Sequence, residues 1–177
     1  MQGQDSVPSI AEAEARGETA AIFADIKKVL GSSVVNLIWR HLATMPGALP
    51  WAWLTVRPLY LGDAPRHAEA VRRTIALPDW PGISADTLLA AGIGESDQAI
   101  IRNVLDSYQY TNALALVVLS ALLAHYEPRP ADAVTPADTA PKPSGRKIPE
   151  RPPMDALDPE VAALVEELNS FGEDTEP

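Results

Sequence analysis

The chain has 177 residues, no cysteine and a formal net charge of −10. The missing thiols exclude disulfides, zinc–thiolate sites, iron–sulfur clusters and cysteine nucleophiles. An acidic chain without a local basic patch is repelled by phosphate backbones, so we expect no nucleic-acid partner. Residues 1–10 lack the pattern of a secretory signal, and the longest apolar stretch, 113–124, is shorter than the about 20 residues of a membrane span. We therefore expect a cytoplasmic protein with no membrane association.

Apolar residues recur at helical spacing through most of residues 10–125, and a glycine or a capping residue marks nearly every boundary. No stretch alternates apolar and polar residues over the length of a strand. The pattern predicts an all-α fold, a multi-helix bundle with no sheet. The expected helices are residues 10–30, 34–45, 48–61, 63–75, 84–91 and, longest of all, 96–124.

Proline content and charge change sharply after residue 126. Eight prolines fall within residues 128–153, and each lacks an N–H and fixes φ, so no continuous helix or strand is expected there. We predict a helical domain at 1–126, a flexible proline-rich linker at 127–157, and a short C-terminal helix and tail at 158–177. Asp158 caps this last helix. Three turns are marginal alone in water, so we expect the helix to dock on its own body, a second subunit or another protein.

Four polar side chains stand on predicted helices that are otherwise largely apolar. Asn36 and Arg40 share a face of a second helix that we expect to be buried on nearly all sides, and Tyr108 and Asn112 share a face of the longest helix. A buried amide or guanidinium needs partners, so we expect Asn36, Arg40 and Asn112 to approach one another beside a small polar pocket for a carboxylate or a water. The alternative is structural: Arg40 pairs with an aspartate or a helix end, and the amides bond to neighbouring backbone.

Aromatic residues cluster early in the chain. Trp39, Trp51, Trp53 and Tyr60 fall within 22 residues of a chain that has only 6% aromatic residues, which is typical of a core or a subunit interface. The three histidines lie far apart in the sequence, and neither a serine nucleophile nor a metal-binding spacing accompanies them. We expect no catalytic triad, no metal and no cofactor.

Two stretches resemble a known family. Residues 17–53, GETAAIFADIKKVLGSSVVNLIWRHLATMPGALPWAW, and residues 90–123, AAGIGESDQAIIRNVLDSYQYTNALALVVLSALL, are similar to the two halves of the repeat unit of the all-helical group I D,L-2-haloacid dehalogenases. The resemblance rests on the L-A-T-x-P-G turn, the spacing between the stretches and a Y-x-x-T-N-like element. It implies the helical fold also found in alkylhydroperoxidase-D-like and carboxymuconolactone decarboxylase proteins.

The resemblance also implies an activity, the hydrolysis of short 2-haloacids. In that family a carboxylate activates a water, which attacks C2 without a covalent ester. Asn112 falls on the family's active-site asparagine, and we expect a catalytic role for it. The family's catalytic aspartate falls on Ile38, which takes no proton. Asp25 or Asp106, the alternative partners of Arg40, would then have to supply the base.

The resemblance covers one copy of the repeat, whereas family members carry two copies in one chain as a pseudo-dimer. A single copy would expose the face that the second covers, so we expect a homodimer, with the Trp39–Trp53 region or the longest helix at the seam. Two hypotheses remain. One is a single-repeat hydrolase acting on a small carboxylic acid, with Asn36, Arg40 and Tyr108 binding substrate; the other is a non-catalytic homodimer that binds a small carboxylate or a protein partner.

Overall fold

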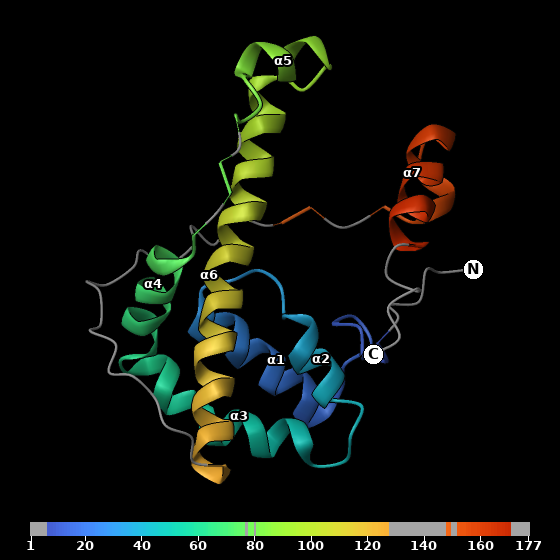
Figure 1. The fold of residues 1–177 in the computed structure, drawn as a ribbon. Helices are drawn as coiled ribbons and strands as arrows, with labels where there is room; N and C mark the ends of the chain where they lie inside the picture. The colour runs from blue at the N-terminus through green and yellow to red at the C-terminus, as the bar shows by residue number, and fades with distance from the viewer. Residues whose placement is uncertain (1–6, 77, 80, 128–147, 150–151, 171–177) are drawn as a thin grey trace. The chain divides into compact units, whose positions relative to one another are not determined.

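The computed structural model describes residues 7–76, 78–79, 81–127, 148–149 and 152–170. They belong to two compact units, one formed by Ser9–Ile148 and the other by Met1–Pro8 with Pro149–Pro177. The described residues form seven α-helices and one short 3-10 helix, with no strand among them (Figure 1). The predicted all-α fold is therefore confirmed. Most of the predicted linker lies outside the described residues.

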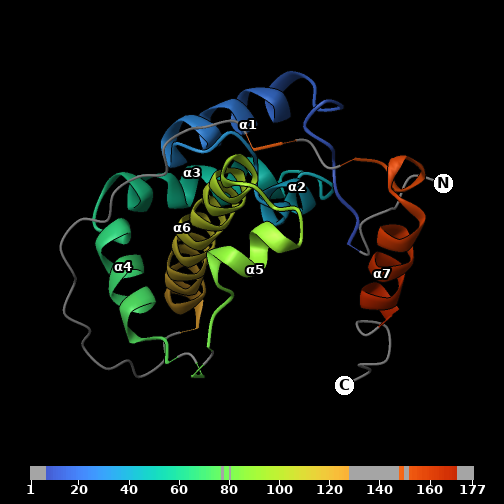
Figure 2. The same cartoon turned by 90° about the horizontal axis from the view of Figure 1, so that it is seen from above.

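Six helices belong to the larger unit. The long helix α6 packs against α3 and α4, and α3 also contacts α1 and α2 (Figure 2). The predicted bounds of the third, fourth and fifth helices are right to within one residue. The six helices are α1 (Gly17–Leu30), α2 (Leu37–Leu42), α3 (Ala48–Leu61), α4 (Ala64–Thr74), α5 (Ala85–Ala90) and α6 (Glu95–Tyr126).

The first helix begins at Gly17, so the predicted start at residue 10 is wrong. Gly17 has a φ of +54°, a left-handed conformation that cannot continue a right-handed helix on its N-terminal side. The segment before it is tied to α2 by a backbone hydrogen bond from the Ile10 N–H to the Arg40 carbonyl (3.1 Å). Ile10 packs against the core, so its apolar character reflects packing and not helix periodicity.

The second helix is shorter than the predicted 34–45. Glu12 Oε1 accepts the Val35 N–H at 2.7 Å, and Ser32 Oγ accepts the Val34 N–H at 3.2 Å, so side chains hold these residues in a loop. In α2 the buried side chain is Trp39, and Leu37 is exposed. The prediction of a helix buried on nearly all sides is therefore wrong.

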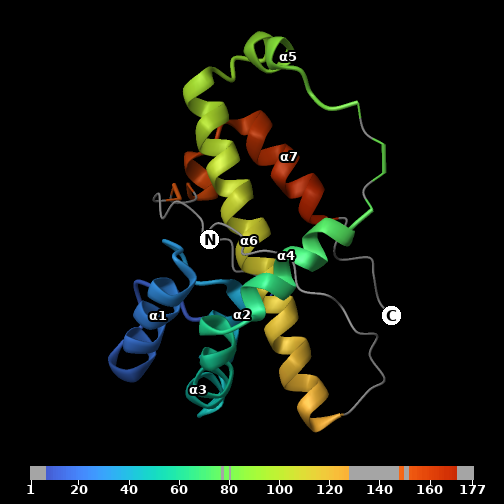
Figure 3. The same cartoon turned by 90° about the vertical axis from the view of Figure 1, so that its left-hand side faces the viewer.

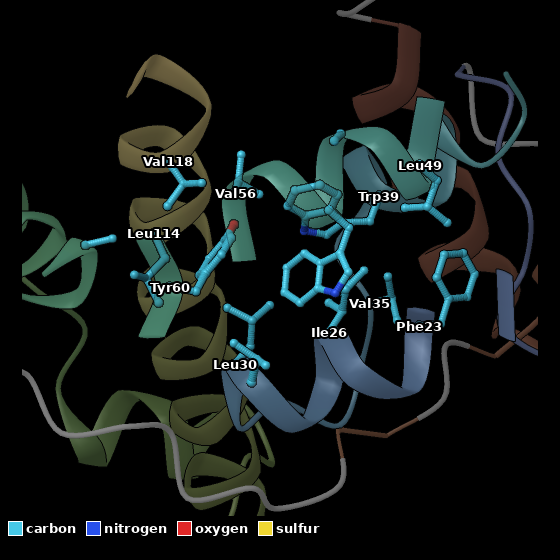
Figure 4. Close-up of a cluster of buried hydrophobic side chains, with 14 of the residues drawn as sticks. Phe23, Ile26, Leu30, Val35, Trp39, Leu49, Val56, Tyr60, Leu114 and Val118 are labelled. Atoms are coloured by element: carbon cyan, nitrogen blue, oxygen red, sulfur yellow. The ribbon is translucent and has the colours of Figure 1, made fainter. Parts of the chain in front are cut away.

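Three aromatic rings form the centre of the core (Figure 4). The Trp39 ring stands edge-on to Trp53 with centroids 5.4 Å apart, and the Tyr60 centroid lies 5.4 Å from that of Trp53. Trp51 is exposed, so three of the four predicted aromatic residues are core. Trp39 and Trp53 are buried within one chain, whereas Trp51 is exposed, so the predicted dimer seam in this region stays a prediction. Aliphatic side chains surround the rings: Ile26, Leu30, Leu49, Val56, Leu114 and Val118.

We expect Tyr60→Phe to match the wild type in stability or to exceed it by up to about 1 kcal/mol. The Tyr60 hydroxyl is buried and has no hydrogen-bond partner among the described residues, so its removal breaks no bond. Burial raises the pKa of Tyr60, so the unfolded chain ionises first, and wild-type stability falls as the pH rises above about 10. Urea unfolding at neutral and alkaline pH measures both effects. A loss of more than about 1 kcal/mol at neutral pH would contradict this account.

The Asp25 carboxylate ties α1 to α3. Its Oδ2 accepts hydrogen bonds from Trp53 Nε1 (2.8 Å) and Arg57 Nε (2.6 Å), and its Oδ1 accepts one from Arg57 Nη2 (3.0 Å). The Arg57 hydrogen bond holds the pKa of Asp25 below its usual value, against the opposite effect of partial burial. Asp25 is therefore a structural ion-pair partner.

We expect Asp25→Ala to lower the free energy of unfolding by about 1–2 kcal/mol, because it leaves the Trp53 N–H without its acceptor and breaks a partly exposed ion pair. Asp25→Asn should cost less, since an amide oxygen still accepts from Trp53. The folded-state pKa of Asp25 is lowered, so its contribution is complete above the unfolded pKa of about 3.9 and disappears as the pH falls further. Urea titrations at pH 7 and about pH 3 test this: equal losses at both would contradict it.

The N-terminal half of α6 extends past α1–α4 in Figures 1 and 3, with α5 near its tip. The helix begins at Glu95 and not behind Ser96; the Asp97 carboxylate accepts the Gly94 N–H at 3.2 Å. In the middle of the helix, side chains such as Leu114 and Val118 are buried. Among the described residues, α6 is the one helix long and apolar enough to cross a membrane by length and composition, criteria that core helices of soluble proteins also meet.

The smaller unit contains the 3-10 helix Met154–Ala156 and α7 (Pro159–Ser170). Asp158 Oδ1 accepts the Glu160 N–H at 2.9 Å, as the predicted cap requires. The apolar side chains Leu164 and Leu168 are exposed. The C-terminal helix is thus confirmed, and the surface on which it docks stays a prediction.

Candidate functional site

Asn36 and Asn112 lie far apart in the sequence and are hydrogen-bonded in the structure. Asn36 Nδ2 donates to Asn112 Oδ1 at 3.0 Å and to Thr111 Oγ1 at 3.1 Å. Asn36 is the residue before α2, where an asparagine normally caps the helix and adds about 1 kcal/mol of stability. Here the side chain makes no capping bond. The amide is directed at α6 instead, at the expense of the cap.

The amide pair keeps polar atoms available. Asn112 is exposed and Asn36 is half-buried. Among the described residues, Asn112 Nδ2 and Asn36 Oδ1 have no hydrogen-bond partner. The pair can therefore offer N–H donors and a carbonyl acceptor to a bound molecule. Such a pair has the chemistry to hold a water or one end of a small carboxylate.

Thr111 was not predicted as part of this site. Its side chain is buried, and its hydroxyl donates to the Ser107 carbonyl at 2.9 Å, one turn earlier in α6. Because the hydroxyl proton is used there, Oγ1 accepts from Asn36, and this fixes the orientation of the Asn36 amide. The sequence signal for Thr111 is the Thr-Asn dipeptide of the Y-x-x-T-N-like element. The family resemblance assigns a role to the asparagine of this dipeptide and none to the threonine.

Arg40 bonds to the N-terminal segment. Its Nε donates to the Ile10 carbonyl at 3.1 Å, and its Nη2 donates to Ser9 Oγ at 3.0 Å. Neither bond involves Asn36 or Asn112. Of the three groups expected to meet, the structure therefore brings the two amides together and shows Arg40 fastening the segment before α1 to α2.

Tyr108 lies one helical turn before Asn112 on the same face of α6. Its side chain is about half exposed (48%). It therefore flanks the amide pair on the N-terminal side, with its ring open to solvent.

Three carboxylates are candidates for the base. Asp25 is held by Arg57, and its lowered pKa makes it a weaker base. Asp106 lies six residues before Asn112, which places it on a different face of α6. Glu12, which was not predicted, accepts the N–H of Val35, the neighbour of Asn36, and its Oε2 pairs with Lys27 Nζ at 2.7 Å. The Glu12 carboxylate is thus anchored beside the backbone that carries Asn36.

Ile38, where the family resemblance places the catalytic aspartate, is partly buried and packs against the hydrophobic core. An aliphatic side chain is explained there by packing. Among the described residues, no group of three or more histidine, aspartate or glutamate side chains is placed to hold a metal ion.

Comparison with known proteins agrees with the resemblance. No family model matches the chain. A configuration-inverting 2-haloacid dehalogenase from Alcaligenes xylosoxydans xylosoxydans is 30% identical over 125 residues, which are 70% of this chain and 42% of that protein. An (R)-2-haloacid dehalogenase from Pseudomonas putida is 28% identical over 115 residues, which are 60% of this chain and 38% of that protein.

One solved structure, a D-2-haloacid dehalogenase mutant in complex with D-2-CPA, superposes with a TM-score of 0.65 at 18% identity. The superposition covers 93% of this chain and 60% of that one, and it supports the fold. The chain spans less than half the length of the two curated relatives it matches. The sequence similarity supports the group I 2-haloacid dehalogenase family, and the superposition shows that the chain has the helical fold of a D-2-haloacid dehalogenase.

Proposed function

We propose that this chain is a hydrolase that cleaves the carbon–halogen bond of short 2-haloacids, with Asn36 and Asn112 holding the attacking water or the substrate carboxylate. The observation that carries the proposal is the Asn36–Asn112 hydrogen bond, which gives up a helix cap and leaves Asn112 Nδ2 unpartnered among the described residues. The two dehalogenase relatives supply the reaction class.

The reaction is a single displacement at C2. The water oxygen bonds to C2 as the carbon–halogen bond breaks, the halide leaves with the bonding electrons, and a proton of the water passes to a base. A direct displacement inverts C2, so D-2-chloropropionate gives L-2-hydroxypropionate. One relative is named as configuration-inverting, in accord with this course.

Position 38, where the family places its aspartate, is isoleucine, so another carboxylate must act as the base. We assign this role to Glu12. Both of its oxygens are held, one by the Val35 N–H and one by Lys27, and these contacts fix the carboxylate beside the backbone of Asn36. A general base contributes about 10²–10⁴-fold to such a reaction.

Glu12→Gln is therefore expected to lower chloride release from 2-chloropropionate by about 100-fold or more. Glutamine still accepts the Val35 N–H, so the loop is preserved. Lys27→Met is the matched control: it breaks the same ion pair but leaves the carboxylate, and its chloride release should stay within a few fold of the wild type.

Chloride-electrode assays with both enantiomers, together with calorimetric binding of 2-chloropropionate, measure turnover and binding separately. Binding without chloride release by the wild type would contradict the proposal and favour the non-catalytic alternative. Equal losses in Glu12→Gln and Lys27→Met would contradict the assignment of Glu12 alone.

A further inference from the structure

An exposed apolar stripe runs along α6. Successive members are three or four residues apart, so at 100° per residue they fall within about 40° of one line along the helix. Leu105 and Leu116 expose 56% and 59% of their surface, and Asn112 lies between them. We call these residues the α6 stripe; its apolar members are Ile101, Leu105, Tyr108, Leu116, Leu119 and Leu123. All are exposed except Leu119, which is partly buried and packs against the core.

The α6 stripe is symmetric about Asn112. Its apolar members lie four, seven and 11 residues before Asn112 and four, seven and 11 residues after it. If two antiparallel α6 helices are related by a two-fold axis through Asn112, each apolar residue of one stripe lies opposite an apolar residue of the stripe on the second copy. Tyr108 faces Leu116 of the second copy, and the two Asn112 side chains meet at the axis.

The N-terminal half of α6, which extends past α1–α4, exposes apolar side chains to solvent (Figure 1). Ile101 and Leu105 lie in the N-terminal half of α6 and are exposed at 43% and 56%. A helical arm gains little stability by itself, and its apolar side chains are stabilised only when another surface removes them from water. The stripe contains no charged residue, so a second apolar stripe is the surface that complements it.

We propose that a second copy of this chain covers the α6 stripe, forming an antiparallel helix pair with Asn112 on the two-fold axis. The symmetry of the stripe makes the surface self-complementary, which a two-fold interface requires. An asparagine within an apolar helix seam fixes orientation and register.

The pairing also completes the amide site. The two Asn36–Asn112 pairs meet at the axis, where the second copy covers Asn112 and removes it from bulk water. Each site then contains Asn112 from both copies. The dimer itself does not rest on the proposed hydrolysis, because the stripe and its symmetry follow from burial and spacing alone.

Sedimentation of the full chain at tens of micromolar is expected to give a dimer. Leu105→Glu, on the stripe, should raise the dimer dissociation constant by at least 100-fold. Ile100→Glu is the matched control. Ile100 is 47% exposed but lies about 120° around α6 from the centre of the stripe, so this variant should keep the wild-type dimer dissociation constant. A monomeric wild type, or equal weakening by both variants, would overturn the inference.

Disulfide trapping tests the orientation and does not depend on a destabilising variant. The chain has no cysteine, so introduced thiols are the sole ones. In the antiparallel pair, the double variant Ile101→Cys/Leu123→Cys should form a covalent dimer on oxidation, whereas Ile101→Cys alone should not, because disulfides need Cα atoms within about 7 Å. Cross-linking by Ile101→Cys alone would indicate a parallel pair and overturn the proposal.

The two proposals fail separately. A wild type that sediments as a dimer but releases no chloride contradicts the hydrolysis and leaves the dimer standing. A monomeric wild type that releases chloride overturns the dimer and leaves the hydrolysis standing. If both hold, chloride release by Leu105→Glu should fall in parallel with its dimer fraction, while that of Ile100→Glu stays at the wild-type level.

Discussion

Asn112→Ala is expected to lower chloride release from 2-chloropropionate by about 10³-fold, the upper range for removing one preorganised hydrogen-bond donor. The free energy of unfolding should change by less than about 1 kcal/mol. Asn112 is exposed, and Asn36 keeps its bond to the Thr111 hydroxyl when Asn112 is truncated. Chloride release and urea unfolding of the same preparation measure the two effects side by side.

Gln109→Ala provides the matched control for Asn112→Ala. Gln109 is also an exposed amide of α6, and its Oε1 accepts a 3.2 Å hydrogen bond from Arg72 of α4. Its removal costs a comparable hydrogen bond but leaves the amide pair intact, so chloride release should be unchanged. If Asn112→Ala instead lost more than about 2 kcal/mol of stability and kept its chloride release, the amide pair would be structural.

Trp39→Ala is expected to destabilise the protein by about 3–5 kcal/mol, the cost of emptying a large aromatic site in a packed core. The Trp39 side chain is fully buried and contacts both Trp53 and Tyr60. Trp51→Ala is the control: Trp51 is 51% exposed, and its removal should cost about 0.5 kcal/mol or less. Urea unfolding followed by circular dichroism gives both values.

Trp39→Phe refines the same prediction. The Trp39 Nε1–H is buried and has no hydrogen-bond partner among the described residues, so phenylalanine removes an unsatisfied donor while it keeps much of the ring packing. The loss should be clearly smaller than for Trp39→Ala. Equal losses for the two variants would contradict a packing origin of the effect.

Helix boundaries were predictable where local chemistry sets them. Asp158 caps α7 through the Glu160 N–H, and Gly31 ends α1 in a left-handed conformation, as the sequence pattern indicated. The errors at α1 and α2 have a different origin. The N–H groups of Ile10 and Val35 bond to partners that are distant in the sequence, and apolar spacing carries no information about such contacts.

The candidate site was predictable in part for the same reason. Asn36 and Asn112 were identified because amides are uncommon on largely apolar helices, and the structure brings the two together. The direction of the Arg40 side chain depends on Ser9 and Ile10, which lie at the start of the region predicted as helix and found as turn and irregular chain. Glu12 comes from the same segment, so the error in the first helix concealed both contacts.

A single-turnover reaction in H₂¹⁸O, with the full chain in excess over D-2-chloropropionate, tests the central claim most directly. Direct attack of water held at the amide pair predicts that the first turnover already gives L-2-hydroxypropionate with ¹⁸O in its hydroxyl group, together with one chloride. Mass spectrometry of the product reads the isotope, and chiral chromatography reads the configuration. A first-turnover product with ¹⁶O, or no hydroxypropionate at all, would contradict hydrolysis by direct water attack.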